Sequence, residues 1–69
     1  MSEISITEVL RRLRPRYPDV TFDLVEANGV FRMSALCNDG TWSWMRGNLA
    51  STGAALTFAH VAMDEFHGS

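Results

Sequence analysis

Two dipeptides, Asn28-Gly29 and Asp39-Gly40, constrain the fold more than any other feature of this 69-residue sequence. Both are flanked by residues that alternate between apolar and polar, and this pattern is typical of hairpins closed by two-residue type I′ turns. The sequence therefore predicts a three-stranded antiparallel sheet. Its strands are expected at residues 20–26, 30–37 and 41–46.

Counting outward from the two turns assigns the same residues of the middle strand to one face. The first turn places Ala35 opposite Phe22, and the second places Ala35 opposite Trp44. Opposed residues share a face, and a one-residue slip in either hairpin would break this agreement. We therefore expect a buried face made of Val20, Phe22, Leu24, Phe31, Met33, Ala35, Cys37, Trp42 and Trp44. The uncovered face is expected to hold Thr21, Asp23, Val25, Arg32, Ser34, Leu36, Ser43 and Met45.

A first helix is predicted over residues 5–14. Ser5 and Glu8 form a capping box, in which the Ser5 hydroxyl accepts from the Glu8 amide and the Glu8 carboxylate reaches back to Ser5. Apolar side chains then follow at helical spacing. Pro15 is expected to end the helix, because the residue before a proline is disfavoured in the α region.

A second helix is predicted over residues 53–66, after a loop at residues 47–53 that offers Ser51 or Thr52 as the N-cap. Small residues in its apolar stripe would let it lie close to the large side chains of the sheet. The stripe consists of Ala55, Phe58, Ala59, Ala62, Met63 and Phe66. The order α-β-β-β-α predicts a single α+β domain with both helices packed on one face of the sheet.

Composition limits the classes of function. The chain is 46% hydrophobic, which is enough for one compact core, and its net charge of −2 argues against a general nucleic-acid binder. Cys37 is the single cysteine, so the chain has no internal disulfide and no cysteine-built zinc site. We expect no cofactor. The N-terminal residues lack the pattern of a signal peptide and no segment could span a membrane, so a cytoplasmic protein is expected.

The chain resembles the double-stranded-RNA-binding domain in its element order and length, over nearly the whole sequence. Residues 20–29 resemble the first strand and following turn of that family, and residues 47–55 resemble its loop into an alanine-rich last helix. The resemblance implies the same fold. It does not carry over the RNA-binding residues, because the basic cluster at the start of the last helix is replaced by uncharged residues 51–56, and the long first hairpin loop is reduced to Asn28-Gly29.

Arginines crowd the end of the first predicted helix. Four of them, Arg11, Arg12, Arg14 and Arg16, fall within six residues. They could hold phosphates or an acidic protein surface. They are equally typical of a solvated helix end, where cations favour the helix dipole and Arg12 can pair with Glu8.

Two further groups could carry chemistry. His60, Asp64 and His67 share one face of the last helix and could bind zinc, although they also fit an exposed polar stripe. Trp42 and Trp44 could stack on bases, but in the predicted register they face the helices and belong to the core. We predict no metal site.

The uncovered sheet face is the strongest candidate for a contact surface. Val25, Leu36 and Met45 are apolar there and are expected to lie near one another, with Arg32 beside them. The last strand is uncharged at its centre, so its edge could pair with another chain, including a second copy.

These features favour a non-catalytic protein-binding module. The sequence has no nucleophile beside a base, no close carboxylate pair and no glycine-rich phosphate loop, so we do not expect an enzyme. A lone small domain of this kind suits a phage or mobile-element accessory protein that binds and inhibits or redirects a host protein. The alternative is a nucleic-acid-binding domain that uses the cluster from Arg11 to Arg16.

Overall fold

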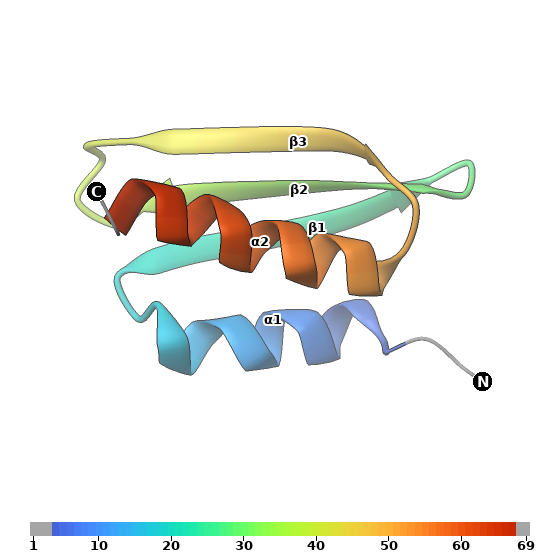
Figure 1. Ribbon diagram of the computed structural model, residues 1–69, viewed down its shortest axis with the longest axis horizontal. Helices are drawn as coiled ribbons and strands as arrows, with labels where there is room; N and C mark the ends of the chain where they lie inside the picture. The colour runs from blue at the N-terminus through green and yellow to red at the C-terminus, as the bar shows by residue number, and fades with distance from the viewer. Residues whose placement is uncertain (1–3, 68–69) are drawn as a thin grey trace.

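The computed structural model describes the backbone of residues 4–67 and the side chains of residues 4–65. Five elements follow one another in the predicted order α-β-β-β-α (Figure 1). They are α1 (Ile6–Arg16), β1 (Val20–Ala27), β2 (Val30–Cys37), β3 (Ser43–Leu49) and α2 (Thr52–His67). The strands form one antiparallel sheet in the order β1-β2-β3, and both helices lie across one of its faces. The predicted α+β class is confirmed.

The first hairpin has the predicted turn and register. Asn28 and Gly29 both adopt positive φ, at 54° and 81°, as a type I′ turn requires. Val20 accordingly pairs with Cys37 at the far end of the hairpin. The alternating burial of β1 and β2 follows from this register, since every second side chain points to the helices.

The second hairpin keeps the predicted register but closes differently. Ala35 pairs with Trp44 as expected. The Gly40 amide donates to the carbonyl of Cys37 at 2.8 Å, and Gly40 has positive φ whereas Asp39 does not. The prediction of a type I′ turn at Asp39-Gly40 is therefore wrong. The Asp39 carboxylate accepts from the amide and hydroxyl of Thr41, at 3.0 and 2.7 Å, so a wider turn is stabilised and β3 begins at Ser43 instead of residue 41.

The first helix continues through Pro15, contrary to the prediction that Pro15 ends it. The Tyr17 amide donates to the carbonyl of Leu13 at 3.0 Å and closes the last turn. The Tyr17 ring also packs against Phe22 of β1, with the ring centroids 5.9 Å apart. These contacts hold residues 15 and 16 in the helix, because tertiary packing outweighs the local preference of a residue before proline.

Both helices have the predicted caps in part. The Ser5 hydroxyl accepts from the Glu8 amide at 3.1 Å, but the Glu8 carboxylate turns to Arg12 instead of returning to Ser5. Ser51 caps α2 by accepting from the Ala54 amide at 3.0 Å.

The third strand extends beyond its predicted end, through three residues that were expected to form a loop. The pairing shifts by one residue between Met33–Arg46 and Phe31–Leu49, which indicates a bulge at residues 47–48. Asn48 has φ of 58° within it. The bulge turns Leu49 to the inner face, where it is buried with the core.

The core lies between the sheet and the two helices. Its apolar members are Val9, Leu13, Val20, Phe22, Leu24, Phe31, Met33, Ala35, Leu49, Ala55, Ala59, Ala62 and Met63. Cys37, Trp42 and Trp44 lie on the same face, but each is only half-buried because it stands near the rim of the sheet. Phe66, predicted for the α2 stripe, lies outside the described side chains.

Candidate functional site

The outer sheet face is open, because both helices cover the opposite face. Four of its apolar side chains are strongly exposed: Met45 at 66%, Leu36 at 51%, Val30 at 43% and Val25 at 41%. All of them except Val30 were predicted to lie on this face. The sheet holds them on paired strands, so their positions are fixed relative to one another.

The strand register divides these apolar residues into two groups. Met45 is opposite Ser34, and Leu36 is two residues further along β2, so Leu36 and Met45 are diagonal neighbours. Both line one shallow depression with Thr21, Asp23, Ser34 and Ser43. We call Leu36 and Met45 with these four polar neighbours the Leu36–Met45 patch.

Val25 belongs to the other end of the outer face. It pairs with Arg32, which is four residues, or roughly 13 Å, from Leu36 along β2. Val25 and Arg32 share a second depression with Val30 and the bulge residues Gly47 and Asn48. The expectation that Val25, Leu36 and Met45 form one patch is therefore wrong. Residues on the same face are neighbours only when they also lie at similar positions along the paired strands.

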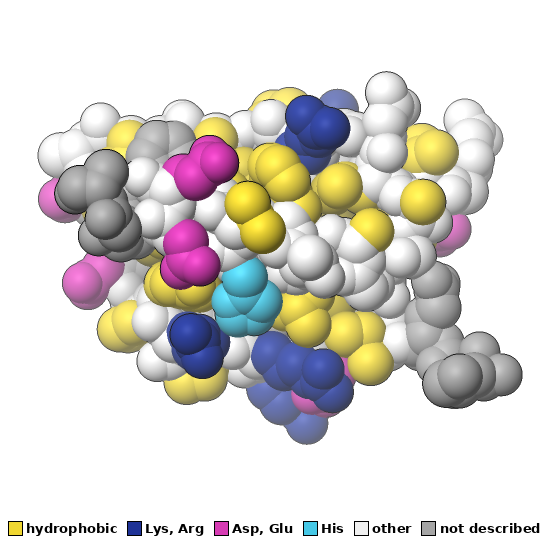
Figure 2. Space-filling view, viewed as in Figure 1, with side chains coloured by type: hydrophobic (Ala, Val, Ile, Leu, Met, Phe, Trp, Pro, Cys, Tyr) yellow, Lys and Arg dark blue, Asp and Glu magenta, His cyan; other side chains and the backbone are white. Residues whose placement is uncertain are grey.

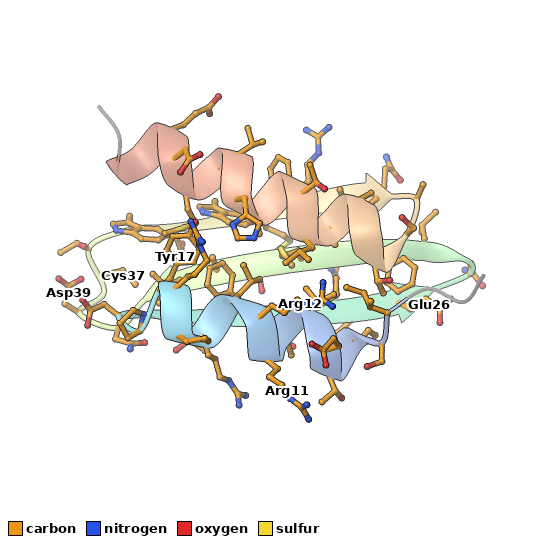
Figure 3. All side chains as sticks on the ribbon, turned by 60° about the horizontal axis from the view of Figure 1, so that its bottom comes forward. Arg11, Arg12, Tyr17, Glu26, Cys37 and Asp39 are labelled. Carbon is orange, nitrogen blue, oxygen red and sulfur yellow. The ribbon has the colours of Figure 1, made fainter. Side chains whose placement is uncertain are left out.

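The arginines of α1 are all exposed, and they leave the helix in more than one direction (Figure 3). Arg11 and Arg14 line one side of the helix with Thr7 and Leu10. Arg12 leaves α1 on a different side from Arg11 (Figure 3). Figure 2 shows basic side chains along the edge of the molecule where α1 lies.

Glu8 forms ion pairs with two of these arginines. Its carboxylate lies 3.6 Å from the Arg11 guanidinium and 3.1 Å from that of Arg12. The Arg12 pair is the helix-surface interaction that the sequence suggested. Arg14 and Arg16 remain as exposed cations near the end of the helix, where they complement its dipole.

Sequence reasoning missed a groove of about 940 Å³ at the end of the molecule where α1 meets the second hairpin. Figure 3 shows Tyr17, Cys37 and Asp39 together at this end. The groove is formed by the α1–β1 connection and the β2–β3 turn, and it is lined by Arg16, Tyr17, Pro18, Asp19, Val20, Cys37, Asn38, Asp39, Thr41 and Trp42. No local motif encodes it, since its walls come from two turns that are distant in sequence.

The charge of Asp39 is stabilised at the mouth of this groove. Hydrogen bonds from the Cys37 side chain and from Thr41 lower the pKa of the Asp39 carboxyl from 3.8 to about 2. A carboxyl with a lower pKa in the folded chain stabilises the fold above its unfolded pKa, and this contribution disappears as the pH falls from 3.8 towards 2.

We therefore expect Asp39→Asn to reduce the sensitivity of the fold to acid. The thermal unfolding midpoint of the wild type should fall more than that of Asp39→Asn when the pH is lowered from about 5 to about 2. Thr41→Val removes the hydroxyl donor but keeps the amide donor. The acid sensitivity of this variant should therefore lie between those of the wild type and Asp39→Asn. Equal losses in all three proteins would show that these hydrogen bonds do not couple to folding.

The remaining candidates lie on the helix side of the sheet. His60 Nδ1 is 3.3 Å from the Tyr17 hydroxyl, so this histidine joins α2 to the end of α1. Asp64 is exposed, and the side chain of His67 lies outside the described residues.

The two tryptophans face the helices, as predicted. Trp44 packs edge-on against Phe58 of α2 with the ring centroids 5.4 Å apart, and the Arg46 guanidinium lies 5.4 Å from the centre of the same Phe58 ring. The indole N–H of Trp44 is buried and has no acceptor among the residues that the structure describes. Both tryptophans are half-buried, and they lie on or next to β3, an edge strand of the sheet.

The outer face with its Leu36–Met45 patch is thus the most distinctive surface of the described chain. Between residues 4 and 67, neither helix combines the length and the apolar character needed to cross a bilayer. Comparison with models of protein families, with characterised proteins and with solved structures found no significant match for this chain.

Proposed function

We propose that this chain is a small non-catalytic protein-binding module that contacts its partner through the Leu36–Met45 patch. The observation that carries the proposal is the placement of two neighbouring apolar side chains, more than half exposed, on the uncovered face of a rigid sheet. Single exposed apolar residues are ordinary, but adjacent ones inside a polar rim favour a protein contact.

The chemistry of the patch suits an apolar anchor from the partner. Leu36 and Met45 supply the apolar centre, and the hydroxyls of Thr21, Ser34 and Ser43 surround it. An interface of this kind gains most of its free energy from the buried centre, while the rim excludes water. Arg32 and Val25, at the other end of the same face, extend the surface available to a larger partner.

We further propose that the fold is of the double-stranded-RNA-binding type, and that in this chain it binds a protein instead of RNA. Supporting this are the element order and the two helices on one face of the sheet. The first turn of α2 has no charged residue, and the β1–β2 turn consists of Asn28-Gly29 alone. Each missing phosphate contact lowers affinity for RNA, so this chain is not expected to bind RNA in the manner of that family.

The biological setting we propose is a phage or mobile-element accessory protein that modulates a host protein in the cytoplasm.

Paired charge substitutions test the patch directly. Leu36→Asp places a carboxylate in its centre, and Val61→Asp places one on α2 at nearly the same exposure, 50% against 51%. Proteins enriched from a lysate by the immobilised wild type should be retained by Val61→Asp and reduced at least about tenfold by Leu36→Asp. Circular dichroism checks that both variants are folded.

Equal capture by both variants would contradict the role of the patch. Binding to a labelled RNA duplex, measured by gel shift at rising salt, tests the alternative based on the arginines. Binding that weakens steeply with salt, and that is lost in a variant with Arg14→Ala and Arg16→Ala, would favour nucleic-acid recognition.

A further inference from the structure

The sheet has two edge strands, β1 and β3. They differ in whether the backbone amides that point away from the sheet have hydrogen-bond acceptors within the chain. The Cys37 amide donates to the carbonyl of Trp42 at 3.0 Å, which identifies these two residues as a hydrogen-bonded pair. Bonded pairs alternate along an antiparallel ladder, so Trp44 and Arg46 also bond towards β2. The amides and carbonyls of Ser43 and Met45 therefore point away from the sheet.

The β1 edge is partly closed by the chain itself. By the same alternation, the amides of Val20, Phe22, Leu24 and Glu26 point outward from β1. The Val20 amide donates to the carbonyl of Tyr17 at 3.1 Å, and the Leu24 amide donates to the Asp23 carboxylate at 3.0 Å. These occupied amides alternate with those of Phe22 and Glu26, so no two successive outward amides of β1 lack an acceptor. On β3, within the described chain, the successive outward amides of Ser43 and Met45 both lack one. The β3 edge is thus the one that can accept another strand.

The ends of β3 limit the register of such pairing. On one side, the Thr41 amide already donates to the Asp39 carboxylate at 3.0 Å. On the other, the bulge at residues 47–48 disrupts the regular strand. The regular edge that remains is short and is centred on Trp44, with one outward-pointing residue on each side.

We infer that β3 pairs antiparallel with β3 of a second copy of this chain, about a two-fold axis at Trp44. Ser43 of each copy then lies opposite Met45 of the other, and each such pair exchanges two backbone hydrogen bonds. The result is one continuous six-stranded sheet. A two-fold axis at Ser43 would need the occupied Thr41 amide, and an axis at Met45 would place the pairing on the bulge.

The side chains of this edge are complementary to their own two-fold copies. Arg46, the charged residue of β3, falls opposite Trp42 of the second copy. Its guanidinium, which lies over Phe58 in its own chain, can also approach that indole ring. The two Arg46 residues are four positions apart along the paired strands, roughly 13 Å, so their repulsion is largely screened. Trp42 and Trp44 are half-buried in one chain and would each lose exposed area. This inference goes beyond the proposed function, because it uses the backbone groups of Ser43 and Met45 at the edge of the sheet, whereas the Leu36–Met45 patch uses side chains on the outer face.

The wild type provides the first test. Sedimentation over a range of concentrations should show a species of twice the 7.7 kDa chain mass at high concentration. Amide exchange of Ser43 and Met45 should slow by at least about tenfold between dilute and concentrated samples, since each amide gains an acceptor. The amides of Trp44 and Arg46, which bond to β2, should change little. A single-chain mass at all concentrations, or unchanged exchange at Ser43 and Met45, would overturn the inference.

A matched pair of substitutions then tests the edge itself. Ser43→Pro removes an outward amide without removing a bond to β2, whereas Ser43→Ala keeps the amide. The dissociation constant should rise by about tenfold or more for Ser43→Pro and remain near the wild-type value for Ser43→Ala. A dimer that tolerates Ser43→Pro would refute pairing through β3. Leu36→Asp should leave dimerisation intact, because Leu36 is on the central strand, so failure of the patch and failure of the edge are distinguishable.

Discussion

Replacing Met33 with alanine is expected to lower the free energy of unfolding by about 2–5 kcal/mol. Met33 lies in the central strand with no exposed area, between Leu24 on β1 and Arg46 on β3. Truncation removes buried methylene groups and leaves a cavity, since neighbours on both strands are fixed by the ladder. A domain of this length has a total stability of roughly 3–10 kcal/mol, so the loss is a large share of it.

The chain contains a matched control for this substitution. Met45→Ala removes the same atoms from a methionine on the opposite face, two-thirds exposed, and should change the free energy of unfolding by no more than about 0.5 kcal/mol. Urea denaturation of both variants measures the difference. Similar losses in the two proteins would mean that the sheet does not separate a buried from an open face.

Ala59→Leu is expected to destabilise the fold by about 1–3 kcal/mol through overpacking. Ala59 has no exposed area and lies on the face of α2 that packs against the sheet. A larger side chain would push α2 away from the sheet and disturb the packing of Phe58 on Trp44. The near-ultraviolet circular dichroism of the tryptophans should therefore change together with the denaturation midpoint.

Val61→Leu controls for the chemical change on the same helix. Val61 is half exposed, so an added methylene there meets solvent and should leave the midpoint nearly unchanged. If Ala59→Leu were as stable as Val61→Leu, the close approach of α2 to the sheet would not depend on the small residue at position 59.

The sheet could be predicted because its signals are local and repeat each other. The Asn28-Gly29 turn sets the register of the first hairpin, and the alternation of side chains then determines both faces. The predicted register of the second hairpin was correct although its predicted turn type was wrong. The reason is that β2 pairs with both β1 and β3, so its inward-facing residues determine the inner face of both neighbouring strands. Ala35, opposite Phe22 and Trp44, is the residue where the two constraints meet.

Features that depend on contacts between distant segments could not be predicted. Pro15 remains in α1 because Tyr17 is held by Phe22, and the sequence around Pro15 contains no sign of that contact. The bulge at residues 47–48 and the groove beside Asp39 are likewise set by tertiary packing and turn geometry. The candidate patch was predicted in part. Periodicity placed its residues on the correct face, but the separation of Val25 from Leu36 became clear only from the residue-by-residue pairing of the strands.

The start of α2 has a consequence for how the chain folds. The buried Thr52 hydroxyl donates to the carbonyl of Ile4 at 2.6 Å, a bond between residues 48 positions apart. The two helices contact each other directly, and α1 also packs on β1 while α2 packs on β2 and β3, so the bond belongs to the tertiary structure of the whole domain. Closing so long a loop costs entropy before any contact compensates for it. The domain is therefore expected to fold as one cooperative unit in which the two helices complete their packing together.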